Sequence, residues 1–299
     1  MRTPPKKVVV LGATGFLGRN VFELLKSANL AIGTSRSKND DALLYLDITD
    51  ELTWNNLLSY SPDIVINAIG YGVVKHETNI ELVYQVNYFM ASRLHEMIRA
   101  VNPSLIWIQI GTAFEYDLSV AEITEQSACV PRTHYGISKL MMTNYLLNKD
   151  PDNAVILRPF AMFGPHEDSS KIIPTLILSQ LKKAEVVLST GTQERDYCYV
   201  KDVAAFIQMI IESEAPNKYR QITNLGSGKP ISLRALSGCI AGQLSVSDEA
   251  LWQWGKLPQR QGESEIFFNA SEKAEALGFV HTSFEIALAE TIKYYVNVA

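Results

Sequence analysis

The chain is poor in cysteine, and its cysteines are not arranged for cross-linking or metal binding. It has three, at Cys129, Cys198 and Cys239, an odd number without any C-x-x-C spacing. This pattern indicates neither a disulfide framework nor a zinc site, and it fits a reducing cytoplasm. The five histidines are scattered and also lack metal-ligand spacing, although His134 and His166 could line a cleft. No metal is therefore expected.

Long apolar runs and an excess of basic charge are also missing. No uninterrupted apolar run approaches the roughly 18 residues that a membrane-spanning helix needs. Gly12 and Gly15 interrupt the first apolar stretch, so this stretch is too short for a signal peptide. A net charge of −5 offers no basic footprint for nucleic acid. With 47% hydrophobic and 20% charged residues, the composition is that of a soluble globular protein, so a cytoplasmic location is expected.

Apolar runs alternate with helical patterns along the first half of the chain. Strands are predicted at residues 8–11, 31–36, 42–47, 63–70, 105–112 and 154–158. Helices are predicted to follow the first strand and to cover residues 80–101 and 135–147. This order predicts an α/β fold with a doubly wound parallel sheet and helices on both of its faces.

The second half of the chain has shorter elements and more turns. Helices are predicted at residues 171–183, 200–212, 232–244 and 283–296, with a strand at 185–189. The expected division is a nucleotide-binding domain over residues 1–165 and a smaller C-terminal region over 166–299. The boundary is soft, because residues 186–213 could pack back on the main sheet. Such sheets bind ligands beyond the carboxyl ends of their strands, where the smaller region would cover a substrate.

A glycine-rich turn links the first strand to the first helix. Gly12, Gly15 and Gly18 form G-x-x-G-x-x-G, one residue longer than the G-x-G-x-x-G fingerprint of Rossmann units. Glycine allows close backbone approach, and the helix start offers free N–H groups to phosphate. The predicted cofactor-binding residues of this turn are Gly12, Thr14, Gly15, Phe16, Leu17 and Gly18. Alone, the spacing also fits a strand-to-helix turn in any α/β protein.

Arg36 ends the second predicted strand, where a dinucleotide enzyme meets the adenosine ribose. NAD-preferring units commonly place an acid there, whereas an arginine can accept a 2′-phosphate. The first acids after the strand are Asp40 and Asp41, in an expected loop. NADP(H) is therefore favoured and NAD(H) remains possible. The alternative is an ordinary exposed loop arginine.

Tyr135 and Lys139 stand four residues apart at the start of a helical segment, so both side chains share one face. A nearby ammonium favours the phenolate form of a tyrosine, and such a pair can act as a general acid-base unit. Chance spacing on a helix is the alternative. Thr112 follows a buried strand and is either a third member of the site or a helix-cap hydroxyl.

Taken in order, the motifs resemble those of the extended short-chain dehydrogenases/reductases. These motifs are the glycine turn, Asp47-Ile48, Asn67-Ala68, Thr112, Tyr135-Gly-Ile-Ser-Lys139 and Arg158-Pro-Phe-x-x-Phe-Gly-Pro165. The resemblance covers nearly the whole chain and is to the NAD(P)-dependent epimerase/dehydratase group acting on nucleotide-sugars. Several ordered motifs together are far more specific than any one of them.

The resemblance implies a role for each matching residue. Tyr135 would donate or accept the proton at the substrate oxygen, and Thr112 would hydrogen-bond the same oxygen. Lys139 would bind the nicotinamide ribose and hold down the tyrosine pKa. Asp47 would contact the adenine, with Ile48 and Ala68 also at the cofactor. Asn87 would align with a structural or proton-relay asparagine, or be a helix-surface amide.

The resemblance extends to the substrate and to assembly. Arg195 and Arg260 align with arginines that contact the substrate diphosphate, and planar guanidinium groups bind phosphate oxygens in pairs. Either arginine could instead be structural or solvated. A nucleotide-sugar is the implied substrate. A homodimer through residues 80–101 and 135–147 is expected by analogy with the family.

The surrounding residues favour one reaction among those of the group. Dehydratases follow the active-site threonine with Asp-Glu, but here Ala113-Phe114 follow Thr112, and Glu115 comes one place late. Arg36 indicates an exchangeable NADPH, so reduction of a 4-ketosugar is favoured. The overall pattern resembles CDP- or dTDP-linked 4-keto-deoxyhexose reductases such as the abequose and paratose synthases. The alternatives are an NAD-dependent 4-epimerase and a catalytically idle NADP-binding protein.

Overall fold

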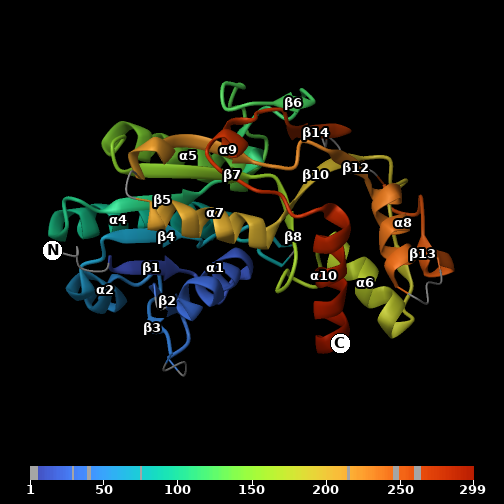
Figure 1. Cartoon of the computed structure of the whole chain (residues 1–299), viewed down its shortest axis with the longest axis horizontal. Helices are drawn as coiled ribbons and strands as arrows, with labels where there is room; N and C mark the ends of the chain where they lie inside the picture. The colour runs from blue at the N-terminus through green and yellow to red at the C-terminus, as the bar shows by residue number, and fades with distance from the viewer. Residues whose placement is uncertain are drawn as a thin grey trace.

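A computed structural model describes residues 6–28, 30–38, 42–74, 76–213, 216–244, 249–258 and 264–299. Within them the main sheet has seven strands, all parallel, in the order β11-β7-β5-β4-β1-β2-β3 (Figure 1). Its strands are β1 (Val8–Leu11), β2 (Ala31–Ser35), β3 (Leu44–Tyr45), β4 (Ile64–Asn67), β5 (Ile106–Ile110), β7 (Ala154–Pro159) and β11 (Gln221–Leu225). The predicted α/β fold with a doubly wound parallel sheet is confirmed.

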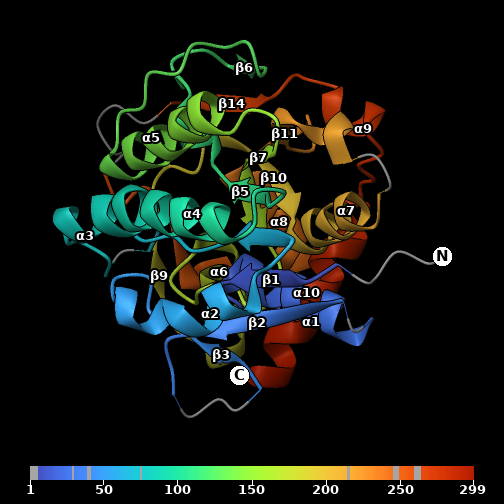
Figure 2. The ribbon, with the colours of Figure 1, turned by 90° about the vertical axis from the view of Figure 1, so that its left-hand side faces the viewer.

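Helices cover both faces of this sheet (Figure 2). The α-helices in chain order are α1 (Phe16–Ser27), α2 (Asn55–Tyr60), α3 (Ile80–Tyr84), α4 (Met90–Val101), α5 (His134–Lys149), α6 (Ile172–Lys182), α7 (Val200–Glu212), α8 (Leu233–Gln243), α9 (Lys273–Ala276) and α10 (Phe284–Val298). Short 3-10 turns occur at η1 (Glu51–Trp54), η3 (Ala113–Glu115), η4 (Pro216–Tyr219) and η5 (Glu249–Leu251).

The apolar strands are explained by burial on both sides. Along β1, Val8 and Val10 point to the core beneath α1 and α7, while Val9 and Leu11 point to the core beneath α2, α4 and α5. Successive residues of a strand face opposite sides of the sheet, so a strand covered on both faces is apolar throughout. This accounts for the continuous apolar runs from which the parallel sheet was predicted.

Segments from the second half of the chain complete the main sheet and one of its helical layers. Strand β11 pairs with β7 at the sheet edge, and α7 packs against α1. Helix α7, within residues 186–213, thus packs on the main sheet, and residues 221–225 add a strand at the sheet edge. These segments lie with the N-terminal strands although they follow residue 165.

The smaller C-terminal region stands to the right in Figure 1 and has its own core. Here α6, α8 and α10 pack together around Leu176, Leu236 and Leu288. A second sheet contains β12 (Pro230–Ser232), β10 (Glu194–Tyr199), β14 (Ile266–Asn269) and β6 (Glu122–Ile123), and β8 (Ala161–Phe163) also pairs with β10. The strands β9 (Val186–Val187) and β13 (Trp252–Gln253) form a third pair.

The helix predicted over residues 80–101 contains a wider turn. Helices α3 and α4 are joined by a π-helical turn, η2 (Gln85–Phe89), and Asn87 lies within it, 2% exposed. Such turns often occur at functional sites. The amide of Asn87 donates to the carbonyl of Tyr71 and to the Ser138 hydroxyl, and its oxygen accepts from the Tyr71 N–H. Asn87 therefore ties the loop after β4 to α5 and is not a helix-surface amide.

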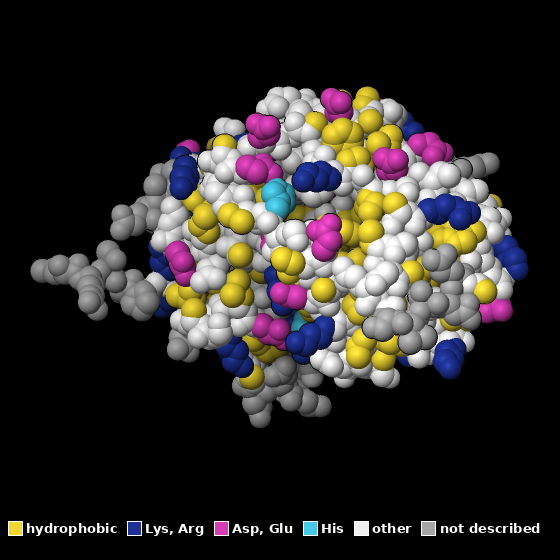
Figure 3. All heavy atoms as spheres, turned by 45° about the vertical axis from the view of Figure 1, so that its right-hand side comes forward, with side chains coloured by type: hydrophobic (Ala, Val, Ile, Leu, Met, Phe, Trp, Pro, Cys, Tyr) yellow, Lys and Arg dark blue, Asp and Glu magenta, His cyan; other side chains and the backbone are white. Residues whose placement is uncertain are grey.

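The molecular surface agrees with the charge balance of the chain. On the face shown in Figure 3, acidic and basic side chains are interspersed among small apolar patches, without a continuous basic area among the residues described there. No helix within the described parts of the chain is both long and apolar enough to span a membrane.

Candidate active site at the carboxyl ends of the parallel strands

The glycine turn has the geometry expected of a phosphate cradle. Gly12 has a φ of +77°, a conformation that favours glycine, and the Gly15 N–H donates to its carbonyl. A Cβ on Gly18 would lie 2.1 Å from the same carbonyl oxygen, so only glycine allows this approach. Gly15 precedes α1 without a side-chain cap of its own. The first N–H groups of α1 thus remain available to an anion.

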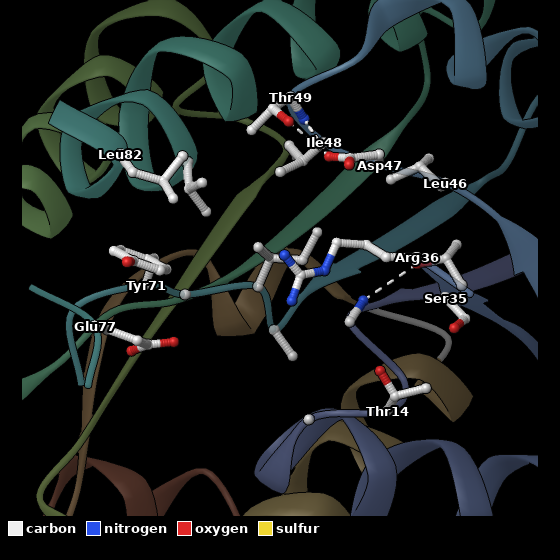
Figure 4. A pocket seen from close by; sticks show the side chains of 17 residues that line it. Thr14, Ser35, Arg36, Leu46, Asp47, Ile48, Thr49, Tyr71, Glu77 and Leu82 are labelled. Atoms are coloured by element: carbon white, nitrogen blue, oxygen red, sulfur yellow. Dashed lines mark hydrogen bonds between the residues drawn. The ribbon is translucent and has the colours of Figure 1, made fainter. Parts of the chain in front are cut away.

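A cavity of about 240 Å³ opens beside this turn (Figure 4). Among the predicted cofactor residues, its lining includes Gly12, Thr14, Gly15, Arg36, Asp47, Ile48 and Ala68. The Arg36 side chain is exposed and extends from the end of β2 across the cavity, with its guanidinium facing the middle. The cavity is therefore positively charged at the place where the sequence predicts a 2′-phosphate.

The far wall of the cavity is set by Asp47 and its neighbours. The Asp47 carboxylate accepts hydrogen bonds from the N–H and the hydroxyl of Thr49, at 2.9 and 2.8 Å. Thr53 and Trp54 both donate to the Asp47 carbonyl. Ile48 is 3% exposed and contributes an apolar surface beside this carboxylate. An apolar surface with a fixed hydrogen-bond acceptor suits a flat heterocycle such as adenine.

Three residues of the turn contribute differently from the rest. Phe16 packs against the core beneath α1, Leu17 belongs to that core, and Gly18 meets the Gly12 carbonyl. Their side chains or Cα atoms are directed into the protein. Only their main-chain N–H groups are suited to meet a phosphate.

Tyr135, Lys139 and Thr112 come together where β4 and β5 end. The Lys139 ammonium lies 5.8 Å from the centre of the Tyr135 ring, and the Thr112 hydroxyl is near enough to the Tyr135 phenol to lower its pKa. The ammonium donates to the carbonyls of Ile69 and Ile110, both at 3.1 Å. Thr112 is also the N-cap of η3, so both roles considered for its hydroxyl are present.

Burial controls the protonation of this pair. Removal from solvent raises the pKa of Tyr135, the Glu115 and Glu77 carboxylates raise it further, and the Thr112 hydroxyl opposes the rise. Burial lowers the pKa of Lys139 to about 8, against the opposing charge of Glu115. The pKa of Tyr135 is thus raised, and the lowering by Lys139 that the family resemblance implies is not what this structure shows. At neutral pH the phenol carries a proton that it can donate.

Arg195 is linked to the turn at Thr112 through aromatic rings. Its guanidinium lies over the ring of Phe267 at 4.8 Å and donates to the carbonyls of Glu194 and Glu265. Phe267 is in edge contact with Phe114, two residues after Thr112. Arg195 therefore lies on the same side of the molecule as the turn that carries Thr112. Arg260, the second arginine predicted to bind diphosphate, lies outside the described residues, as do Asp40 and Asp41.

Two carboxylates at this site were not assigned a role from the sequence. Glu115 is fully buried and accepts from the Thr112 N–H, the second half of a capping box. The T-x-x-E spacing is a signal that could have revealed it. Glu77 lines the cavity and accepts from three consecutive N–H groups, those of residues 72–74, at 2.8 to 3.2 Å. No local sequence pattern predicts these three hydrogen bonds to Glu77.

The histidines lie apart from any metal arrangement. Among the described residues, no group of three or more His, Cys, Asp or Glu side chains is arranged to hold an ion. His134 contacts the Tyr84 hydroxyl, and His166 contacts the Tyr294 hydroxyl, each at 2.9 Å. Both histidines are thus held by tyrosines.

Comparisons with known proteins agree with the family that the sequence motifs resemble. Residues 8–226 match the model of the "NAD dependent epimerase/dehydratase family". A putative UDP-glucose 4-epimerase of Methanocaldococcus jannaschii is 25% identical over 309 residues, covering 97% of each chain. The CDP-abequose synthase of Salmonella typhimurium is 20% identical and covers 91% of this chain and 92% of its own. Among solved structures, the UDP-glucose 4-epimerase of Thermus thermophilus in complex with NAD has a TM-score of 0.85 at 20% identity, covering 98% of this chain and 100% of its own.

Proposed function

Because this chain belongs to the NAD dependent epimerase/dehydratase family, we propose that it is an NADPH-dependent reductase of a nucleotide-linked 4-ketosugar. The observation that carries the proposal is the guanidinium of Arg36, which extends into the cofactor cavity from the end of β2. A guanidinium group at this place favours the 2′-phosphate of NADPH, and NADPH is the cofactor form used in reductions. The glycine turn, the open start of α1 and the wall at Asp47 fit the rest of the dinucleotide.

The residues at the strand ends supply the acid chemistry of such a reduction. When bound, the cofactor supplies a hydride for the carbonyl carbon. The Tyr135 phenol donates its proton to the carbonyl oxygen, and Thr112 holds that oxygen by a hydrogen bond. Lys139, fixed on the carbonyls of Ile69 and Ile110, binds the nicotinamide ribose and stabilises the phenolate left after proton transfer. The three side chains thus polarise and protonate one oxygen.

The same geometry argues against dehydration. Elimination of water needs an acid and a base that reach the substrate. The carboxylate nearest to Thr112 in sequence, Glu115, is 0% exposed and paired with Arg158. It is held in the interior and does not reach the substrate.

A nucleotide-sugar is the substrate class that the position of Arg195 supports. Arg195 presents a guanidinium above Phe267, close enough to Phe114 to share a wall with the turn at Thr112. A diphosphate on Arg195 places the attached sugar toward Thr112 and Tyr135. We extend this proposal to Arg260, which would bind the same diphosphate, and to a homodimer through residues 80–101 and 135–147. The half-exposed Phe89 and Val101 lie at the ends of η2 and α4, on the segment that would meet its partner.

An NAD-dependent nucleotide-sugar 4-epimerase is the second candidate, favoured by the names of the Methanocaldococcus and Thermus relatives. The two activities separate in a panel of CDP-, dTDP-, GDP- and UDP-linked 4-keto-6-deoxyhexoses assayed with NADPH. A reductase consumes one NADPH for each ketosugar. An epimerase, assayed separately with NAD and nucleotide-sugars that carry a C4 hydroxyl, interconverts the two C4 epimers without net consumption of cofactor. Absence of NADPH oxidation with every member of the panel would rule out the reductase.

Arg36 provides a test of the cofactor preference. The variant R36A should weaken NADPH binding by roughly 10- to 100-fold, because charge-assisted hydrogen bonds to the 2′-phosphate are lost. NADH binding should change by less than about 2-fold, since NADH has no such phosphate. Fluorescence titration of both cofactors measures the two effects. K26A, at the far end of α1, controls for the loss of one positive charge. Equal weakening of NADPH and NADH would contradict the assignment.

A further inference from the structure

Glu115 is held in the interior by polar contacts on both of its oxygens. Oε1 accepts the Thr112 N–H at 3.0 Å. Oε2 accepts the Thr143 hydroxyl at 2.8 Å and two N–H groups of Arg158, at 2.9 and 2.6 Å. The side chains of Glu115 and Arg158 are 0% and 1% exposed. A carboxylate so completely hydrogen-bonded has one orientation, which makes it a fixed buried charge.

This charge lies against the turn that carries the catalytic groups. Lys139 donates to the Ile110 carbonyl, and Glu115 accepts from the Thr112 N–H, two residues further along the same backbone. Gly111 lies between them, and a Cβ there would be 2.4 Å from the Glu115 carboxylate. The side chain of Glu115 thus packs directly beneath the peptide units that end β5.

The charges that face Tyr135 and Lys139 come from several elements. Glu115 approaches from η3, Glu77 from the loop after β4, and Lys139 from α5 itself. Among these, Glu115 raises the pKa of both Tyr135 and Lys139, whereas Glu77 acts on Tyr135. A negative charge stabilises the protonated form of each group, so removing it makes both protons easier to lose.

We propose that Glu115 is a positioning residue of the active site, whose buried carboxylate fixes the Thr112 turn and supplies the negative charge that Tyr135 and Lys139 experience. Arg158 and Thr143 hold this carboxylate in place from β7 and α5. The inference rests on the proposed function for its catalytic consequence, but its electrostatic part concerns the free protein. Glu115 itself touches neither substrate nor cofactor.

The direct test is the titration of Lys139 in the cofactor-free protein. Lysine-selective 13C NMR follows it, with K139M identifying the resonance. The wild type should show a pKa of about 8 for Lys139. E115Q keeps the shape and removes the charge, so its midpoint should fall by about one pH unit or more. If E115Q does not fold because Arg158 is left unpaired, E115Q/R158M removes both charges, and the midpoint should again fall. An unchanged midpoint in the folded variant would overturn the proposal.

Two further variants separate charge from structure. E115D keeps the charge on a shorter side chain, so the Lys139 midpoint should stay near that of the wild type while kcat falls through the displaced Thr112 turn. D150N disrupts another buried carboxylate, paired with His95 and Arg99 away from the site, and should leave the midpoint unchanged. A shift in D150N as large as in E115Q would show that loss of stability, and not Glu115, moves the titration. Because no substrate enters the titration, its outcome is independent of which reaction the protein catalyses.

Discussion

Replacement of Tyr135 by phenylalanine is expected to lower kcat by about 10²- to 10⁴-fold, the usual contribution of a positioned general acid. The phenol is the group that can donate a proton to the substrate oxygen, because burial keeps it protonated at neutral pH and it lies near the Thr112 hydroxyl. Phenylalanine retains the ring and loses only the hydroxyl. Cofactor binding should therefore change by less than about 2-fold. Single-turnover oxidation of NADPH, with a separate binding titration, measures both quantities.

A neighbouring tyrosine that is fully buried provides the control. Tyr116 is 1% exposed and donates to the Asn224 side chain at 2.8 Å, one position after η3. Y116F should cost about 1 kcal/mol of unfolding free energy through the lost hydrogen bond and leave kcat within a factor of about three. If Y135F is as active as Y116F, Tyr135 is not the acid. If instead the wild type itself oxidises no NADPH with any 4-ketosugar nucleotide, the protein is better described as a catalytically idle NADP-binding protein.

The variant K139M should lower kcat/KM by about 10²- to 10³-fold, since it removes the ammonium that binds the ribose and stabilises the phenolate. The wild type should itself lose cofactor affinity as pH rises through about 8, where Lys139 loses its charge. K139M should show no such decline. Binding titrations of NADPH from pH 6 to 10 compare the two proteins; a parallel decline in K139M would assign the alkaline limb to another group.

Stability should move in the opposite direction from activity in this variant. Folding lowers the pKa of Lys139 from 10.5 to about 8, so the folded state binds fewer protons than the unfolded state between these values. The charged lysine therefore destabilises the folded protein below pH 8, by on the order of 3 kcal/mol, and this cost fades as pH rises toward 10.5. K139M has no buried charge at this position, so its Tm at neutral pH should be no lower than that of the wild type. A large drop in Tm would indicate that the two carbonyl hydrogen bonds outweigh it.

Local patterns were sufficient for the elements that are apolar throughout or regularly amphipathic. The strands around β1 are buried on both faces, so their sequence is apolar enough to identify them without knowledge of the fold. Helix α7 (Val200–Glu212) has the bounds that periodicity predicts. The glycine turn, Thr112, Tyr135 and Lys139 were found because short-range spacing sets their positions.

Features that depend on distant partners were not predictable in this way. Asn87, within the π-helical turn, makes hydrogen bonds to Tyr71 and Ser138, which are 16 and 51 residues away in the sequence. Strand β11 joins the main sheet by pairing with β7, and the sequence of its five residues does not predict this pairing. The T-x-x-E spacing indicates the contact of Glu115 with Thr112, but the partner that holds its carboxylate from below, Arg158, is 43 residues later. In each case the decisive partner is supplied by the tertiary structure.

The central claim, reduction at C4 by NADPH, is tested most directly by isotope transfer. NADPH carrying deuterium at its transferable position is incubated with the protein and the best 4-ketosugar nucleotide of the panel, and the product is examined by NMR and mass spectrometry. The account predicts one deuterium at C4 of the sugar for each NADPH oxidised, with loss of the label from the cofactor. No deuterium at C4 and no loss of NADPH, together with interconversion of nucleotide-sugars that carry a C4 hydroxyl in a parallel incubation with NAD, would contradict it and identify an epimerase.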